Sequence, residues 1–195
     1  MSVPEAQSEA PAGVTVAEAA LDIVELAALR DRLHVLKALA ARRGLALAER
    51  GRIMATRDTL VLCVRPQRWL MLSPRVDTGL AASRWQEASA GMAAAVDLSS
   101  ALLALHVYGP NAREALTRGC RLDLDPAAFP SGTAAATVIA QVSAILVALP
   151  SGLLLLTPAT TGRHFRDWLS SAARPFGLEV RASATVAFLS GERST

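Results

Sequence analysis

The same order of apolar segments and turns occurs twice in the sequence, and this repeat constrains the fold more than any other feature. Residues 59–74 read TLVLCVRPQRWLMLSP, and residues 144–158 read AILVALPSGLLLLTP. Each copy has an apolar run of strand length, a turn with proline, a second apolar run and a final Ser-Pro or Thr-Pro pair. Because proline cannot donate a hydrogen bond to a β-ladder, it belongs in the turn and not in the strands. The pattern therefore predicts a β-hairpin in each copy.

A predicted helix lies on either side of each hairpin. Leucines recur at helical spacing before the first copy, and a glycine follows them. The fold class is therefore α+β, with two pseudo-repeated helix–hairpin–helix halves. Such halves can place their strands in facing sheets or in one continuous sheet, with the helices outside. The four predicted helices are Asp31–Arg43, Leu80–Met92, Asn111–Arg118 and Arg163–Ala173.

We expect one domain made of two halves, with a tail at each end. Residues 1–13 are rich in Pro, Ala, Ser and Glu, which predicts a disordered N-terminal tail. Residues 14–95 are the expected first half, and residues 96–180 are the expected second half of the same domain. Residues 181–195 form a C-terminal tail, in which the apolar run 186–189 either docks on a partner or frays.

The most specific local pattern lies in residues 96–129, VDLSSALLALHVYGPNAREALTRGCRLDLDPAAF. A short strand ends at Gly109-Pro110, because the proline cannot continue the ladder. Asn111 is then the expected N-cap of a compact helix, and Gly119 is the expected breaker at the end of that helix. A proline-broken acidic loop follows.

These motifs resemble those of the gamma subunits of heterotetrameric sarcosine oxidase. That family looks like a trimmed relative of the folate-binding aminomethyltransferase (glycine-cleavage T-protein) domain. The resemblance runs from Gly44 to Trp168. The best-matching motifs are Pro66-Gln67-Arg68-Trp69-Leu70, Tyr108-Gly109-Pro110 and Gly119-Cys120-Arg121-Leu122-Asp123-Leu124.

The resemblance implies a non-catalytic gamma subunit that braces the flavin-bearing subunits of an amine oxidoreductase. The partners would be the alpha, beta and delta subunits of a cytoplasmic heterotetramer active in sarcosine catabolism. FAD, a covalent FMN, NAD, zinc and tetrahydrofolate would be bound by those partner subunits and none by this chain. Three alternatives stay open: the gamma subunit of the related N-methylglutamate dehydrogenase, a free-standing folate-binding enzyme of the T-protein type, and a scaffold unrelated to amine oxidation.

The composition points to a protein partner and away from nucleic acid. Apolar residues make up 52% of the chain, the mean hydropathy is +0.33, and aromatic residues account for only 4%. This aliphatic surplus predicts an exposed apolar patch, which a partner protein would cover. The net charge is +3, but the arginines are dispersed, and Arg42-Arg43 is the only doublet. A nucleic-acid-binding protein would cluster its basic residues and interleave them with aromatic ones.

The sequence predicts a cytoplasmic protein without membrane contact. The apolar runs 144–149 and 153–156 are each stopped by a proline or by Thr-Pro, far short of the ~20 residues that a bilayer helix needs. No basic segment precedes an apolar one at the N-terminus, so no export signal is expected. Cys63 and Cys120 lack metal-site spacing and are expected to be reduced, packed thiols.

No catalytic, cofactor-binding or metal-binding residues are predicted. His34, His106 and His164 do not have the spacing of metal ligands, so each is expected to be a surface or capping residue. The chain lacks the Gly-x-Ser-x-Gly elbow of many hydrolases. It also lacks the Gly-x-Gly-x-x-Gly turn of dinucleotide-binding domains, so it should not hold a dinucleotide by itself.

Three acidic residues, Asp97, Asp123 and Asp125, could be read as site residues nonetheless. Asp97 and Ser99 correspond by resemblance to an Asp-x-Ser segment near the folate pocket of aminomethyltransferases. Asp97 and Ser99 can also cap a turn through hydrogen bonds to nearby backbone groups. We favour this turn-capping interpretation over the folate one. Asp123 and Asp125 precede a proline and are expected to lie in a solvated loop or to meet an arginine of another subunit. Cys120 follows a helix C-terminus, which favours packing over reactivity.

Overall fold

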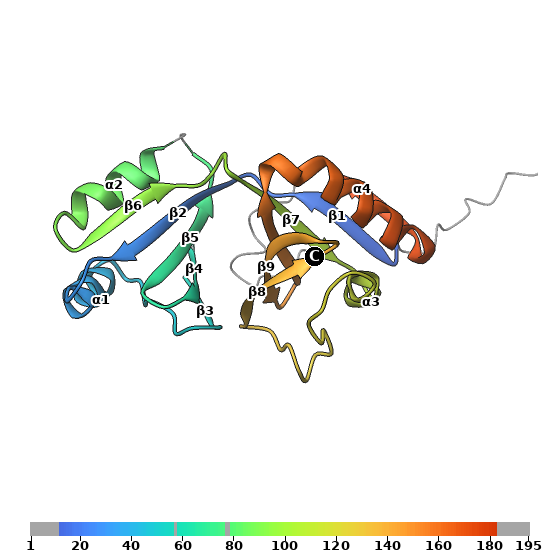
Figure 1. The fold of residues 1–195 in the computed structure, drawn as a ribbon, viewed down its shortest axis with the longest axis horizontal. Helices are drawn as coiled ribbons and strands as arrows, with labels where there is room; N and C mark the ends of the chain where they lie inside the picture. Colours follow the sequence, from blue (N-terminus) through green and yellow to red (C-terminus); the bar gives the residue numbers. More distant parts are fainter. Residues whose placement is uncertain (1–11, 57, 77–78, 183–195) are drawn as a thin grey trace, which may run out of the picture.

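The molecule consists of two facing β-sheets, each covered on its outer side by two α-helices (Figure 1). The computed structural model describes residues 12–56, 58–76 and 79–182. The layers therefore follow the order helices, sheet, sheet, helices. The helices are α1 (Leu33–Arg42) and α2 (Leu80–Ala88) in the first lobe, and α3 (Ala112–Thr117) and α4 (Gly162–Ala173) in the second.

The first sheet has five strands in the order β3-β4-β5-β2-β6, and all neighbours are antiparallel. Strands β4 and β5 form the first predicted hairpin, with Arg65 opposite Arg68. Gln67 in its turn has a φ of 59°. The strands are β2 (Leu21–Ala28), β3 (Ile53–Ala55), β4 (Leu60–Arg65), β5 (Arg68–Pro74) and β6 (Ala93–Asp97).

The second sheet has six strands in the order β11-β1-β7-β10-β9-β8. Strands β9 and β10 form the second predicted hairpin, and only the β1–β11 pair is parallel. The strands are β1 (Val14–Glu18), β7 (Leu102–Tyr108), β8 (Ala134–Ile139), β9 (Val142–Leu149), β10 (Gly152–Pro158) and β11 (Leu178–Arg181). Short 3₁₀ turns, η1 (Ala159–Thr161) and η2 (Arg174–Phe176), precede and follow α4.

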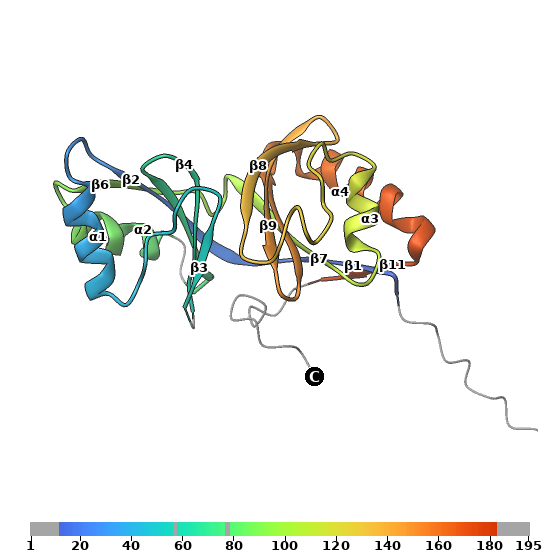
Figure 2. The same cartoon turned by 90° about the horizontal axis from the view of Figure 1, so that it is seen from below.

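Two chain crossings connect the sheets. Strand β1 runs into β2 after two residues, and β6 runs into β7 after four, so each crossing places one strand in each sheet (Figure 2). Strand β1 thus lies in the sheet of the second lobe, although the expected division assigned residues 14–95 to the first half. At the other end of the sheets, Ile53 donates its N–H to the carbonyl of Gly132, which ties the lobes together again.

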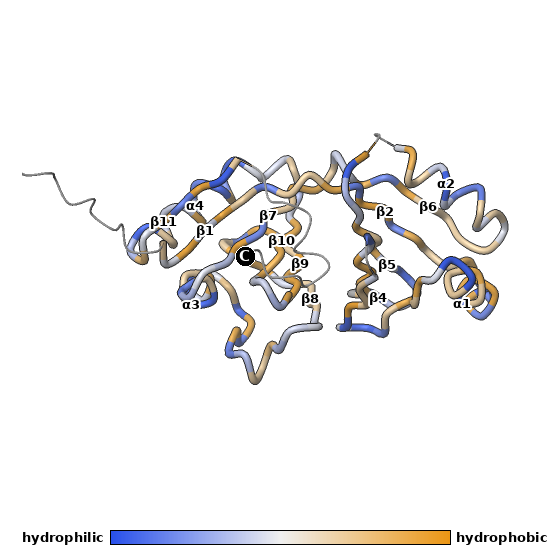
Figure 3. The backbone as a smooth tube through the Cα atoms, turned by 180° about the vertical axis from the view of Figure 1, so that it is seen from behind, coloured by the Kyte–Doolittle hydropathy of each residue, from blue (hydrophilic) through white to orange (hydrophobic). Residues whose placement is uncertain are grey.

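Both faces of each sheet are buried, which explains the uninterrupted apolar runs. In β4, Leu60 and Leu62 face the other sheet, whereas Val61 and Cys63 belong to the cluster under α1 and α2. Figure 3 shows the hydrophobic colour continuing along such strands. An antiparallel sheet covered on both sides has no solvated face and therefore needs no polar residues in alternation. Two-sided burial thus accounts for much of the aliphatic surplus that we had assigned to an exposed patch.

The helices agree with the predicted ranges except at their ends. Helix α2 ends at Ala88, four residues before the predicted end, because the chain turns at Gly91, which has a φ of 72°, and enters β6 at Ala93. Asn111 occupies the N-cap position of α3, but its side chain makes no capping bond and instead contacts Glu114. None of the helices in the described ranges is long and apolar enough to span a membrane. The run 186–189 lies outside the described residues.

Candidate functional site

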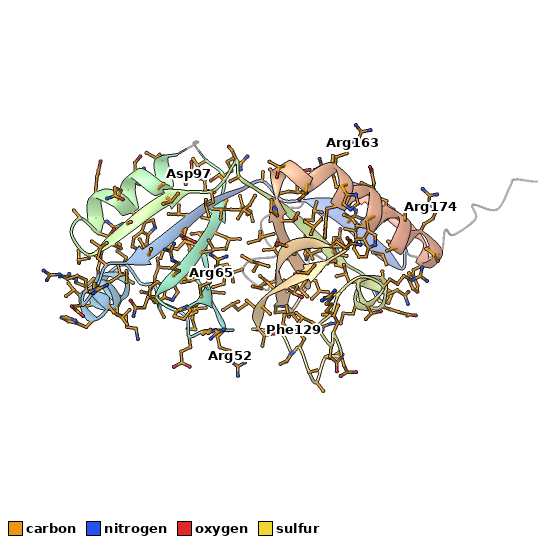
Figure 4. The ribbon with its side chains drawn as sticks, in the orientation of Figure 1. Arg52, Arg65, Asp97, Phe129, Arg163 and Arg174 are labelled. Atoms are coloured by element: carbon orange, nitrogen blue, oxygen red, sulfur yellow. The ribbon has the colours of Figure 1, made fainter. Side chains whose placement is uncertain are left out.

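The crossing between β6 and β7 is held by the Asp97–Ser99 segment. The backbone N–H and the hydroxyl of Ser99 both donate to Oδ1 of Asp97, at 2.9 and 2.5 Å. Oγ of Ser99 in turn accepts the backbone N–H of Ile23 in β2, at 2.9 Å. Ser99 is buried, while Asp97 lies exposed at the end of β6 (Figure 4). The segment therefore forms a turn and attaches it to the other crossing strand.

The electrostatics of the turn keep Asp97 ionised. The Ser99 hydroxyl, the Ser99 amide and the nearby Arg75 guanidinium lower the pKa of Asp97 below its usual value. A carboxylate that accepts hydrogen bonds is stabilised in its charged form. Its bonds are local, which favours the turn-capping interpretation of this pair over the folate one.

Arg75 joins the two crossings from the other side. Its Nη2 donates to the carbonyls of Leu21 and Ser99, both at 2.8 Å, and its Nε donates to the carbonyl of Leu21 at 3.2 Å. Its Nε also lies 3.9 Å from Oδ1 of the buried Asp22. We define Asp22, Arg75, Asp97 and Ser99 as the junction network.

No sequence pattern marks Arg75 or Asp22 as a site residue. Arg75 follows the Ser-Pro pair that ends the first copy of the repeat, but Ala159 stands at the matching place in the second copy. The repeat therefore does not mark Arg75 as a special position. Asp22 accepts the backbone N–H of Val76 through Oδ2, and its Oδ1 has no hydrogen-bond partner in the described part of the chain. The nearby Arg75 guanidinium offsets the cost of burying this carboxylate.

A polar cavity of about 370 Å³ lies beside the junction network. Arg75 and Ser99 line it together with Glu18 and Arg166, which form an ion pair at 3.1 Å. Asp97 is not among its lining residues. The charged side chains at this cavity thus already form an ion pair or hydrogen bonds to backbone carbonyls, which is typical of a structural junction.

His106 is buried, so its expected role as a surface or capping residue was wrong. It lies in β7 on the side facing the first sheet, its ring stacks on Tyr108 with centroids 4.7 Å apart, and Oγ of Ser151 lies 3.4 Å from its Nε2. Burial lowers the pKa of His106 to about 4. His34 and His164 are exposed, as expected. Among the described residues, no three His, Cys, Asp or Glu side chains come together as a metal site.

The cysteines and the acidic loop have local roles. Cys63 is buried and its thiol donates to the carbonyl of Arg65, and burial raises the pKa of Cys63. Cys120 is half-buried and packs against the core of the second lobe. Asp123 and Asp125 are exposed, and each accepts a backbone N–H two residues further along. They form the solvated loop that the sequence predicted.

Most of the exposed arginines have no acidic partner among the described residues. Within the described residues, ion pairs form only at Arg68, Arg75, Arg166 and Arg181. Arg163 and Arg174, at the two ends of α4, point away from the body of the molecule (Figure 4). Charge that is not balanced within the molecule is available to a binding partner.

The comparison with known protein families gives a match over most of the chain. The sequence profile of the "Sarcosine oxidase, gamma subunit family" matches residues 32–173, which is most of the chain. No curated protein sequence matches the chain at a significant level.

The solved structures that resemble the fold include a sarcosine oxidase and an aminomethyltransferase. A chain of the heterotetrameric sarcosine oxidase from Corynebacterium sp. U-96, in complex with pyrrole 2-carboxylate, aligns with a TM-score of 0.73 and 27% identity. That alignment covers 84% of this chain and 85% of the other. The glycine cleavage system aminomethyltransferase T from Bartonella henselae aligns with a TM-score of 0.62 and 11% identity. Here 91% of this chain covers only 49% of the other, so the likeness concerns the fold of about half of that protein.

Proposed function

The chain belongs to the sarcosine oxidase gamma subunit family, and from this premise we propose that it is the non-catalytic gamma subunit of a heterotetramer that oxidatively demethylates sarcosine. Its role is to brace the larger subunits. The observation that carries the proposal is the match of the family profile over residues 32–173, together with the alignment to a chain of a heterotetrameric sarcosine oxidase over most of both chains.

The junction network supports the non-catalytic part of the proposal. Catalysis needs polar groups that are free to contact a substrate. In the network, the Ser99 hydroxyl is shared between Asp97 and the Ile23 amide, and Arg75 is shared between two carbonyls and Asp22. These groups hold together the two chain crossings on which the relative position of the lobes depends.

In this proposal the partners are the alpha, beta and delta subunits, and they hold the cofactors. FAD, FMN, NAD and zinc reside on them, and tetrahydrofolate accepts the one-carbon unit there. The likeness to the aminomethyltransferase concerns the fold alone and spans half of that enzyme, so it lends this chain no folate chemistry of its own.

Co-expression tests the proposal directly. The tagged chain is produced with the alpha, beta and delta subunits encoded in the same organism, and the purified material is analysed by size-exclusion chromatography and by sarcosine-dependent reduction of an electron acceptor. We expect one complex that contains all four chains and oxidises sarcosine, and a loss of stable complex when this chain is omitted. Full assembly and activity without it would contradict the proposal.

The chain purified alone provides the control. We expect it to be colourless and to give no heat signal when titrated with tetrahydrofolate. Stoichiometric flavin, or micromolar binding of tetrahydrofolate by the isolated chain, would favour the free-standing folate enzyme instead. Activity of the complex towards N-methylglutamate but not sarcosine would assign it to the related dehydrogenase.

A further inference from the structure

Building on that proposed function, we propose that a basic depression in the second lobe is the surface on which a partner subunit docks an acidic segment. We call it the Trp168 depression. It is open, has a volume of about 490 Å³ and lies where the end of α3, the β8–β9 turn and helix α4 meet. Its principal lining residues are Arg118, Gly119, Arg121, Gln141, His164 and Trp168.

The close fit of Gly119 against Trp168 shapes one wall. A Cβ atom at Gly119 would overlap Cζ2 of the Trp168 ring, so only glycine lets the indole lie against the end of α3. The Trp168 ring also packs against the buried ring of Phe165, and the centroids of the two rings are 5.7 Å apart. The indole remains half-buried and is therefore a fixed apolar surface within reach of a partner. Aromatic residues of this kind are enriched at protein interfaces.

Hydrogen bonds connect the other walls. The backbone N–H of Ala140, in the β8–β9 turn, donates to the carbonyl of Gly119 at 3.1 Å, and Cys120 forms a β-bridge with Ile139. The depression is thus assembled from three elements that are bonded or packed to one another, and it exists before any partner binds. A preformed surface loses less conformational entropy on binding than a flexible one.

The charge of the depression is positive and is not balanced locally. Arg118 and Arg121 are both exposed, and neither takes part in an ion pair with a described residue. None of the residues that line the depression is acidic. The Arg118 guanidinium lies over the Phe176 ring, 5.0 Å from its centroid, which limits its freedom. Arginines positioned in this way suit carboxylates, which they can bind with two parallel hydrogen bonds.

An acidic protein segment fits these features better than a small anion does. The two arginines line the depression together with an apolar indole and with Val138, a residue that is 38% exposed. A small anion would need an enclosed set of donors, whereas a peptide can place carboxylates on the arginines and an apolar side chain on the indole. Interfaces commonly combine such an aromatic anchor with arginines around it.

A competition experiment tests this inference within the complex. Wild-type chain with one tag and a variant with another tag are co-expressed with the alpha, beta and delta subunits, and the ratio of the two tags in the purified complex is measured. We expect Arg118→Glu/Arg121→Glu to be incorporated at one tenth of the wild-type level or less, because two attractive charge contacts become repulsive. The neutral variant Arg118→Gln/Arg121→Gln should be incorporated at an intermediate level.

The control carries the same change of charge elsewhere. Arg30→Glu/Arg32→Glu alters two exposed arginines before α1, in the other lobe, and should be incorporated as well as wild type. Thermal unfolding of each isolated variant separates loss of folding from loss of docking, and the neutral variant serves if charge reversal unfolds the chain. Equal incorporation of the charge-reversed and control variants would overturn the inference while leaving the proposed function intact. Absence of wild-type chain from the complex would overturn the proposed function itself.

Discussion

The hydroxyl of Ser99 links the two crossings with two hydrogen bonds. It accepts the backbone N–H of Ile23 in β2 and donates to Asp97 at the end of β6, and Ser99 itself is buried. When the acceptor of a buried N–H is removed, that N–H loses its hydrogen-bond partner, and the protein pays the cost of desolvating it. The structural importance of Ser99 therefore exceeds that of an ordinary turn residue.

We predict that Ser99→Ala lowers the free energy of unfolding by about 1–2 kcal/mol, the scale of a lost buried hydrogen bond. Ser100→Ala, at the exposed neighbouring residue, is the control and should change stability by less than about 0.5 kcal/mol. Urea denaturation followed by circular dichroism measures both. Amine oxidation and folate capture per assembled complex should stay near the parent values. A selective loss of folate capture in Asp97→Asn/Ser99→Ala would instead place these residues at a folate site.

His106 makes stability depend on pH in a predictable direction. Burial lowers its pKa to about 4 in the folded chain, whereas the unfolded chain has the ordinary value of 6.5. Between these two values the unfolded state binds a proton that the folded state rejects, so stability falls as the pH falls. The loss attributable to His106 is on the order of 3 kcal/mol when the pH reaches about 4, and it is absent above pH 7.

The matching prediction concerns the slope of stability against pH. His106→Gln cannot titrate, so its stability should fall less steeply than that of wild type between pH 6.5 and pH 4.5. His34→Gln, at an exposed histidine, should keep the wild-type slope. Denaturant unfolding at half-unit pH intervals provides the measurement. Parallel slopes for His106→Gln and wild type would show that this histidine is not buried in its neutral form.

At the scale of elements, the fit between the end of α3 and helix α4 depends on Gly119. Its backbone does not have a positive φ, so alanine suits the local conformation and would ordinarily stabilise the chain slightly. The contact with Trp168 reverses this expectation. The sign of the change in stability therefore reports the packing of the two helices.

We predict that Gly119→Ala lowers the free energy of unfolding by about 1–3 kcal/mol, the usual cost of overpacking. In a Trp168→Leu background the same change should cost much less, because the smaller side chain leaves room for the methyl group. The four proteins form a double-mutant cycle, measured by thermal unfolding. If the effects of the two substitutions on stability are additive, the residues at positions 119 and 168 do not interact sterically.

Several elements formed where local sequence did not indicate them. Strands β6 and β8 begin with three alanines each, a composition that favours helix over strand. They become strands because β2 and β9 offer backbone partners along their length. Strand β11 likewise pairs with β1 from the opposite end of the chain. Pairing between residues far apart in sequence overrides propensity, and no local window contains that information.

At the scale of the whole molecule, the lobes share one apolar core. The cluster between the sheets contains residues from both lobes, including Ile23 and Leu62 from the first and Val147 and Leu154 from the second. Either lobe alone would expose this inner face to water. Together with the two crossings, the shared core makes independent folding of the lobes unfavourable.

We therefore predict a single cooperative unfolding transition. Of the three tryptophans, Trp69 and Trp85 lie in the first lobe and Trp168 in the second. When Trp69 and Trp85 are replaced with phenylalanine, the remaining tryptophan fluorescence reports the second lobe only. When Trp168 is replaced, it reports the first lobe only. In each variant the fluorescence and circular dichroism midpoints in urea should coincide. Separate midpoints would indicate that one lobe unfolds before the other.

The two hairpins, the approximate helices and the family could be predicted from the amino-acid sequence. Apolar runs punctuated by proline predict hairpins because a strand needs only its neighbour in sequence to form one. The acidic loop at Asp123 and Asp125 followed from turn chemistry, which is equally local. The Asp97–Ser99 turn was likewise expected, though not its bond to Ile23.

The choice between facing sheets and one continuous sheet depends on tertiary packing, and the strands form two facing sheets. Tertiary packing also places β1 in the second lobe, buries His106 and brings Arg75 onto two carbonyls from different crossings. The physical reason is the same in each case. Two-sided burial makes every apolar run look alike in sequence, so which face meets the partner sheet and which meets a helix is set by long-range packing and pairing.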